Sequence, residues 1–262
     1  MVSIVIDRRF NGPPNSGNGG YVCGLLARHI SGDAEVTLRA PPPLQRLLDV
    51  HSDADGGVEL TEKGTLLATA RAVTIDALDI PNVAFHAAEA AVARTPFFDE
   101  TSHKLPTCFV CGPSRGREDG LRIFAGPVEK PHDAGRIGLF AATWIPHANL
   151  AGSDGRIAEE FVWAALDCPT GHCSVSASHL GMNGDETILL GRMSASVDRR
   201  PSPGDACVIV AWPTGRDGRK LFAESALLGP DGNVLAMART TWLTVDRDMQ
   251  LGGNQKSAPA AS

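Results

Sequence analysis

Apolar and β-branched residues recur along the chain in short runs, and turn-forming Gly, Pro, Asn and Asp residues separate one run from the next. Such runs are typical of strands in an antiparallel sheet. The Asp-Gly pairs at 217–218 and 231–232 stand between runs and predict hairpin turns. We predict strands over residues 35–40, 47–51, 57–62 and 65–75 in the first half, and over 121–124, 138–144, 186–197, 205–212, 220–228 and 234–245 in the second.

Three segments have helical character instead. A loop dense in Gly, Pro and Asn at residues 10–20 leads into a mostly apolar segment at 21–30, which we predict as a helix. Residues 85–94 are rich in Ala, the strongest helix former, and residues 157–167 follow a polar loop. One helix followed by several antiparallel strands therefore occurs twice.

This repeated order divides the chain into two halves. We predict an N-terminal half over residues 1–95 and a C-terminal half over 119–247. Between them, residues 96–118 are irregular and rich in Pro and Gly, which indicates a linker. The last residues, 248–262, are small and polar, and we predict a disordered tail there.

Charge and composition narrow the class of partner. The 262 residues carry a formal net charge of −6, from 24 basic and 30 acidic side chains, without a basic block. This argues against nucleic acid or an anionic membrane as the partner and favours a small molecule. The N-terminus lacks the features of a signal peptide and no apolar run reaches the length of a spanning helix, so we expect a cytoplasmic protein with its six Cys residues reduced.

Several short motifs resemble one enzyme family. They are CFVCG from residue 108, GLRIF from 120, DGRIAEEFVWAALDC from 154, SVDRRPSPGD from 196, DGNVLAMARTTW from 231, and, more thinly, NGGYV from 18 and VTLRAP from 36. Together they resemble the hotdog-fold acyl-CoA thioesterase superfamily, in its double-hotdog form and similar to phenylacetyl-CoA and 4-hydroxybenzoyl-CoA thioesterases. The resemblance implies an α+β fold, with two repeats of a long helix wrapped by a curved antiparallel sheet.

The two helix entries differ in a way that suggests a shared site. Aligned on the repeat, residues 18–20 (Asn-Gly-Gly) fall where the second half has Ala-Glu-Glu at 158–160, and Asp167 falls where the first half has Ala27. In the family, amides at the Gly-Gly helix start polarise the thioester carbonyl and the acid activates water. Seven helical residues span about 10 Å, so one helix cannot bring both groups to one carbonyl carbon.

The donors and the acid must therefore come from different halves, which predicts a single site between them. By this resemblance the catalytic residues are Asp167, Gly19, Gly20 and Asn18. The alternative is that Asp167 simply ends its helix, because Pro169 and Gly171 follow it.

Four further residues are candidates for substrate binding. Trp163 stands one helical turn before Asp167, where an aromatic ring can set the acyl channel. Thr170 is a candidate to orient water, and Glu160 is a candidate second acid, unless it only favours the helix N-terminus. Arg200, with Arg199, is a candidate for the phosphates of coenzyme A.

The cysteines admit two interpretations. Cys108 and Cys111 form a C-x-x-C pair, and Cys168 with His172 or Cys173 can supply a second pair of zinc ligands. The family that the chain resembles carries a similar motif and needs no metal for its reaction. We therefore expect buried reduced thiols and no metal at Cys108 and Cys111.

We predict a thioesterase that hydrolyses an acyl-CoA or an acyl-carrier thioester. Coenzyme A would then be part of the substrate, and no separate cofactor is expected. Two alternatives stay open. One is a hotdog module that binds acyl-CoA without turnover, and the other is an acyl-thioester hydratase or dehydratase, which needs a catalytic His beside the acid, whereas no His stands at a matching helix position here. The two halves supply the pairing that single hotdogs obtain by dimerisation, although a homodimer is possible.

Overall fold

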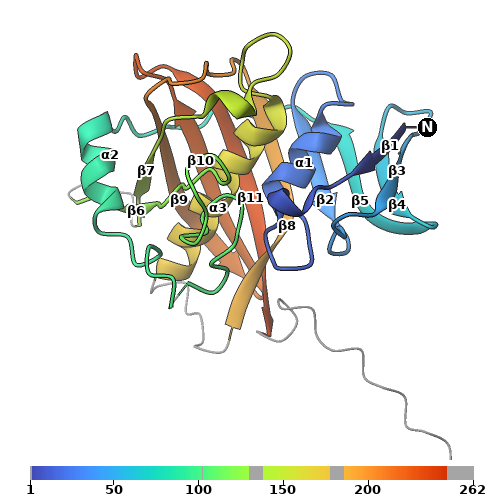
Figure 1. Ribbon diagram of the computed structural model, residues 1–262, viewed down its shortest axis with the longest axis horizontal. Helices are drawn as coiled ribbons and strands as arrows, with labels where there is room; N and C mark the ends of the chain where they lie inside the picture. The colour runs from blue at the N-terminus through green and yellow to red at the C-terminus, as the bar shows by residue number, and fades with distance from the viewer. Residues whose placement is uncertain (1, 102, 130–137, 178–185, 247–262) are drawn as a thin grey trace, which may run out of the picture.

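The structure is a computed structural model that describes residues 2–101, 103–129, 138–177 and 186–246 (Figure 1). Its α-helices are α1 (Gly19–Ala27), α2 (Phe85–Val92) and α3 (Glu159–Ser176), and short 3-10 helices cover Arg8–Phe10 and Ala148–Leu150. The strands are β1 (Val2–Val5), β2 (Ala34–Leu38), β3 (Leu47–Ser52), β4 (Val58–Glu62), β5 (Thr65–Ala72), β6 (Gly126–Pro127), β7 (Phe140–Trp144), β8 (Glu186–Val197), β9 (Cys207–Asp217), β10 (Lys220–Leu228) and β11 (Val234–Asp246).

All of these strands join one antiparallel sheet in the order β1-β3-β4-β5-β2-β8-β11-β10-β9-β7-β6. The order is similar on the two sides of its centre. There β2, the first strand after α1, lies beside β8, the first strand after α3. At this seam Val36 of β2 faces Met193 of β8, and both side chains are fully buried. The sheet is therefore continuous through both halves of the chain.

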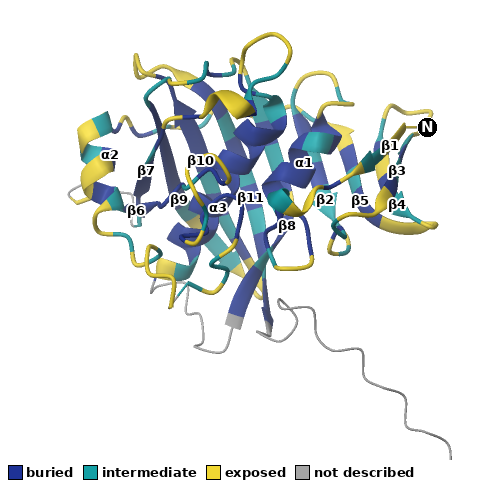
Figure 2. Cartoon of the chain, viewed as in Figure 1, coloured by how far each residue is buried: buried dark blue, intermediate teal, exposed yellow. Residues whose placement is uncertain are grey.

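Helices α1 and α3 lie side by side on one face of the sheet (Figure 1). Both helices are largely buried (Figure 2). Their backbones approach closely where α1 carries glycine: a Cβ at Gly20 would lie 2.5 Å from Cβ of Asp167, and one at Gly24 would lie 2.5 Å from Cα of Glu160. The absence of side chains at Gly20 and Gly24 thus permits the contact between the two helices.

The opposite face of the sheet carries a second, smaller core. Successive residues of a strand point to opposite faces, and on β7 Phe140 belongs to the main core whereas Ala141 packs beneath α2. Ala88 and Ala91 of α2 are fully buried in this smaller core. Helix α2 therefore covers the end of the sheet that lies away from α1.

The predicted elements differ from the observed ones in several places. Residues 121–124 form no strand, because Arg122 has a left-handed backbone (φ 55°) and the amides of Leu121 and Ile123 donate to the carbonyls of residues 109 and 110 rather than to a sheet neighbour. Strands β1 and β6 were not predicted. Helix α3 does not end at Asp167 and continues through Pro169 to Ser176.

The continuation of α3 beyond Pro169 has a tertiary cause. Proline removes one backbone donor from the helix, which usually ends or kinks it. Here two side chains add bonds to the same segment: Thr170 Oγ1 donates to the Asp167 carbonyl (2.6 Å), and Ser174 Oγ donates to the Thr170 carbonyl (2.7 Å). Almost the whole segment is buried, so packing outweighs the local cost.

Among the described residues, no helix has both the length and the apolar character needed to cross a membrane. The predicted tail, residues 248–262, lies outside the part of the chain that the structure describes.

Candidate active site

The site is built at the N-terminus of α1. Asn18 is the N-cap residue, and its Oδ1 accepts a hydrogen bond from the Tyr21 amide at 2.9 Å. This bond satisfies one of the backbone donors that a helix start leaves open. The same side chain donates from Nδ2 to Oδ2 of Asp167 at 3.0 Å, so it joins α1 to α3.

Asp167 projects from α3 toward α1, and only 1% of its surface is exposed. Its Oδ2 accepts from the Gly20 amide at 2.9 Å as well as from Asn18. Its Oδ1 is buried and has no hydrogen-bond partner among the described residues. Burial raises the pKa of Asp167 to about 7, although the bonds from Gly20 and Asn18 lower it.

The structure brings three of the four predicted catalytic residues into direct contact. Asn18 and Gly20 in the first half contact Asp167 in the second, over a sequence distance of almost 150 residues. However, the Gly20 amide is directed at the carboxylate instead of being open to a substrate carbonyl. The Gly19 amide is still open to a substrate carbonyl, because it has no hydrogen-bond partner in the described part of the chain and Gly19 lines the adjoining cavity.

A cavity of about 360 Å³ opens beside these residues. Asn18, Gly19, Cys108 and Asp167 line it, and most of its remaining wall is apolar. Pockets of this size and character accept small organic ligands, with a few polar groups setting the orientation. The apolar wall includes Leu38, Leu105, Ile188, Leu189, Leu190, Trp242, Leu243 and Val245.

Two arginines also line the cavity. Arg39 follows β2, and Arg219 lies in the turn between β9 and β10. Both are exposed, and neither forms an ion pair with a described residue. The sequence alone did not point to them, because they come from separate turns that only the fold brings to one cavity.

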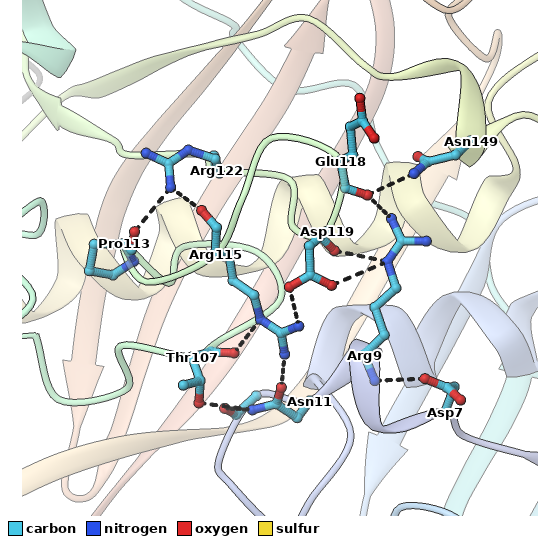
Figure 3. Close-up of polar contacts among 11 residues, drawn as sticks. Asp7, Arg9, Asn11, Thr107, Pro113, Arg115, Glu118, Asp119, Arg122 and Asn149 are labelled. Atoms are coloured by element: carbon cyan, nitrogen blue, oxygen red, sulfur yellow. Dashed lines mark hydrogen bonds and ion pairs between the residues drawn. The ribbon is translucent and has the colours of Figure 1, made fainter.

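The segment between the halves carries Cys108 and is held in place by arginines (Figure 3). Arg115 Nε donates to the Thr107 carbonyl at 2.8 Å, and its guanidinium also bonds to Asn11 and to Asp119. Arg9 donates to the carbonyls of Glu118 and Asp119, both at 2.8 Å. These bonds fasten the segment to the loop that precedes α1, and so they place Cys108 against the cavity.

The four predicted substrate-binding residues lie elsewhere. Trp163 is buried in the contact between α1 and α3, and the Thr170 hydroxyl accepts from Nε1 of Trp242 at 2.9 Å. Glu160 forms an ion pair with Arg28 at 3.3 Å. Arg200 is paired with Asp154 in a separate polar hollow. None of the four lines the cavity beside Asp167.

In sequence comparison, neither a protein-family model nor a curated protein sequence matches the chain. Two solved structures share its fold over nearly their whole length. One is a protein of Novosphingobium aromaticivorans DSM 12444 named as a thioesterase, with a TM-score of 0.56, 12% identity, and coverage of 92% of this chain and 94% of that one. The other is an acyl-CoA thioesterase II of Mycobacterium marinum, with a TM-score of 0.57, 13% identity, and coverage of 93% and 92%.

The chain thus has the α+β fold of these thioesterases, with a large antiparallel sheet. The resemblance that the short motifs indicated is confirmed at the level of the fold. A fold alone does not establish a reaction, because the activity depends on the residues of the site.

Proposed function

We propose that the chain is a double-hotdog thioesterase that hydrolyses an acyl-CoA in the cavity beside Asp167. The observation that carries this proposal is the buried carboxylate of Asp167, which lines an apolar cavity and is held by Asn18 and Gly20 from the other half. A carboxylate whose pKa is near 7 is well suited to general-base catalysis at neutral pH.

In the proposed reaction Asp167 acts on water. Oδ2 is occupied by its two donors, so the unpartnered Oδ1 takes the proton from a water molecule as its oxygen bonds to the thioester carbonyl carbon. The negative charge on the carbonyl oxygen is stabilised by the Gly19 amide at the positive end of α1. The C–S bond then breaks, and the thiolate leaves and takes the proton, giving a free acid and a thiol.

Coenzyme A is favoured as the thiol because of the two arginines on the cavity wall. Its phosphates require positive charge close to the mouth of the acyl cavity, and Arg39 and Arg219 provide that charge without described ion-pair partners. Arg200, the sequence-based candidate, already bonds to Asp154 in the other hollow.

The test is release of thiol from short, aromatic and long acyl-CoAs, and from an acyl-carrier thioester, by the wild type and by Asp167→Asn. We expect the substitution to lower kcat by about 10²- to 10⁴-fold, because the amide cannot accept the proton from water. Asp55→Asn, in an exposed turn, is the matched control and should retain full activity.

The fold of both variants is compared by their melting temperatures. Equal turnover by wild type and Asp167→Asn would refute the role of Asp167. A folded wild type that releases no thiol from any member of the panel would refute the proposal that the chain is a thioesterase.

One observation favours the alternative of a module that binds acyl-CoA without turnover. The Gly20 amide, expected to hold the carbonyl, is bonded to Asp167. Under this alternative the chain would bind an acyl-CoA tightly and return it intact, which the same panel measures by chromatography of the recovered ligand. A hydratase has less support, because no histidine is found among the described residues that line the cavity.

A further inference from the structure

Three buried thiols meet where the segment between the halves touches α3. The Sγ atoms of Cys108, Cys111 and Cys168 all lie within 4.8 Å of one another, and those of Cys108 and Cys168 are 3.8 Å apart. None of the three is in a disulfide, and each is less than a tenth exposed. Four ligands around zinc at about 2.3 Å stand about 3.8 Å from one another, so this spacing suits a shared metal ion.

The backbone around Cys108 is shaped to present its sulfur. Amides of Val110 and Cys111 donate to this thiol, and the Gly112 amide closes the turn on the Cys108 carbonyl at 2.9 Å. A Cβ at Gly112 would lie 2.5 Å from that carbonyl oxygen and 2.6 Å from the Cys108 nitrogen. Glycine is therefore required for the turn that folds back over the sulfur.

Two imidazoles lie beside Cys111 and form a second group of donors that shares this sulfur with the three thiols. One ring nitrogen of His103, one ring nitrogen of His172 and the Cys111 sulfur all lie within 4.8 Å of one another. His103 Nδ1 accepts from the Leu105 amide, which leaves Nε2 buried without a partner among the described residues. Nδ1 of His172 is likewise buried and unpartnered in the described part of the chain.

The rings are held in position by packing. His172 stacks on Phe97 with ring centroids 4.0 Å apart, and it follows Cys168 by four residues on α3, so both face the same side of the helix. Buried polar atoms are normally satisfied, and two unpartnered imidazole nitrogens beside the thiols favour binding of a cation at this cluster.

We propose that Cys108, Cys111 and Cys168, closed by an imidazole from the pair His103 and His172, bind one zinc ion. Thiolates and imidazole in a tetrahedral set are the ligands that zinc prefers, and four protein ligands leave no open position for water. The ion therefore stabilises the structure and takes no part in hydrolysis. The sequence favoured metal-free thiols, because the C-x-x-C pair by itself is only half of a site.

The zinc ion would also support the candidate active site. It joins the segment between the halves to α3 directly behind Asn18, whose Nδ2 lies 4.0 Å from Sγ of Cys108 and 3.9 Å from Sγ of Cys168. Because Cys108 lines the cavity, loss of the ion would loosen the wall next to Asp167.

The experiment measures the metal content of the tag-free full chain by elemental mass spectrometry. We expect about one zinc per chain in the wild type, and at least a 10-fold loss in Cys108→Ser, Cys111→Ser and Cys168→Ser. Cys173→Ser and Cys207→Ser are matched controls, since both thiols are buried outside the cluster and should leave the zinc content unchanged. Of His103→Ala and His172→Ala, one should lose zinc and the other should retain it.

Measurements on the wild type alone cover the case in which the Ser variants do not fold. Removal of zinc by a chelator should lower the melting temperature, and added zinc, but not magnesium, should restore it. Cobalt in place of zinc should give the sulfur-to-cobalt absorption bands of a thiolate site. A wild type without zinc, a different resident metal, zinc retained in the Cys108 or Cys168 variant, or an intact mass that shows a Cys108–Cys168 disulfide would each overturn the proposal.

Discussion

At the scale of the residue, Asn18 combines two roles that are usually separate. Its Oδ1 caps α1 by accepting from the Tyr21 amide, while its Nδ2 donates to Asp167. From the sequence, Asn18 was predicted only as a candidate site residue at a helix entry, and its capping role was not predicted. The bond to Asp167 was not readable from local pattern, since the two residues are far apart in the chain.

Asn18→Ser separates the two roles. Serine is as good a cap as asparagine, so we expect the free energy of unfolding to change by less than about 1 kcal/mol. The donor to Asp167 is lost, and kcat should fall by about 10- to 100-fold. Urea unfolding and thiol release measure the two effects, and a parallel loss of stability and activity would contradict this division.

The cavity arginines are expected to act on substrate affinity. Arg39→Ala and Arg219→Ala should each raise KM for an acyl-CoA by about 10-fold and leave kcat nearly unchanged, because the phosphates lie away from the reacting bond. The same substitutions should not affect hydrolysis of an acyl-pantetheine, which lacks the nucleotide. Arg200→Ala is the control, and an equal effect from it would argue against the assignment of Arg39 and Arg219.

At the scale of the element, the contact between α1 and α3 sets the geometry of the site. The helices approach so closely because Gly20 and Gly24 of α1 present no side chains to Trp163 and its neighbours on α3. Both the strands and the helix starts were largely predictable, since apolar runs and glycine-rich turns are local signals. The length of α3 was not, because buried packing holds it together beyond Pro169.

Gly24→Ala should therefore disturb both packing and activity. The added Cβ would lie 2.5 Å from Cα of Glu160 and 2.9 Å from Cβ of Trp163, so the helices must move apart. We expect a loss of about 1–3 kcal/mol in the free energy of unfolding, and lower kcat because the bond from Gly20 to Asp167 lengthens. Gly116→Ala, where a Cβ meets nothing within 4 Å, should be neutral in both measurements.

At the scale of the whole molecule, the sheet is symmetrical about β2 and β8, but the chemistry is not. One pair of helix ends places Asn18 and Gly20 against Asp167. At the other pair, Glu160 bonds to Arg28, and Ala27 stands where the first site has its acid. We therefore expect one site per chain.

Isothermal titration with a non-hydrolysable thioether analogue of an acyl-CoA should accordingly give about one ligand per chain. Glu160→Gln should leave both the stoichiometry and kcat close to those of the wild type, because Glu160 does not line the cavity. A stoichiometry of two, or a large loss of kcat in Glu160→Gln, would show that the second helix entry is also a working site.

The sequence by itself predicted most of the elements, their repeated order and the candidate site residues Asn18, Gly19, Gly20 and Asp167. These features depend on local periodicity, on turn residues, and on a spacing along α3 too long for one helix to hold both donor and acid. The tertiary structure alone decided that the Gly20 amide bonds to Asp167, that Arg39 and Arg219 share its cavity, and that Cys168 completes a cluster with Cys108 and Cys111. Each of these contacts joins residues from separate parts of the chain, and their distances are set by the packing of the helices, the sheet and the segment between the halves, which no local pattern encodes.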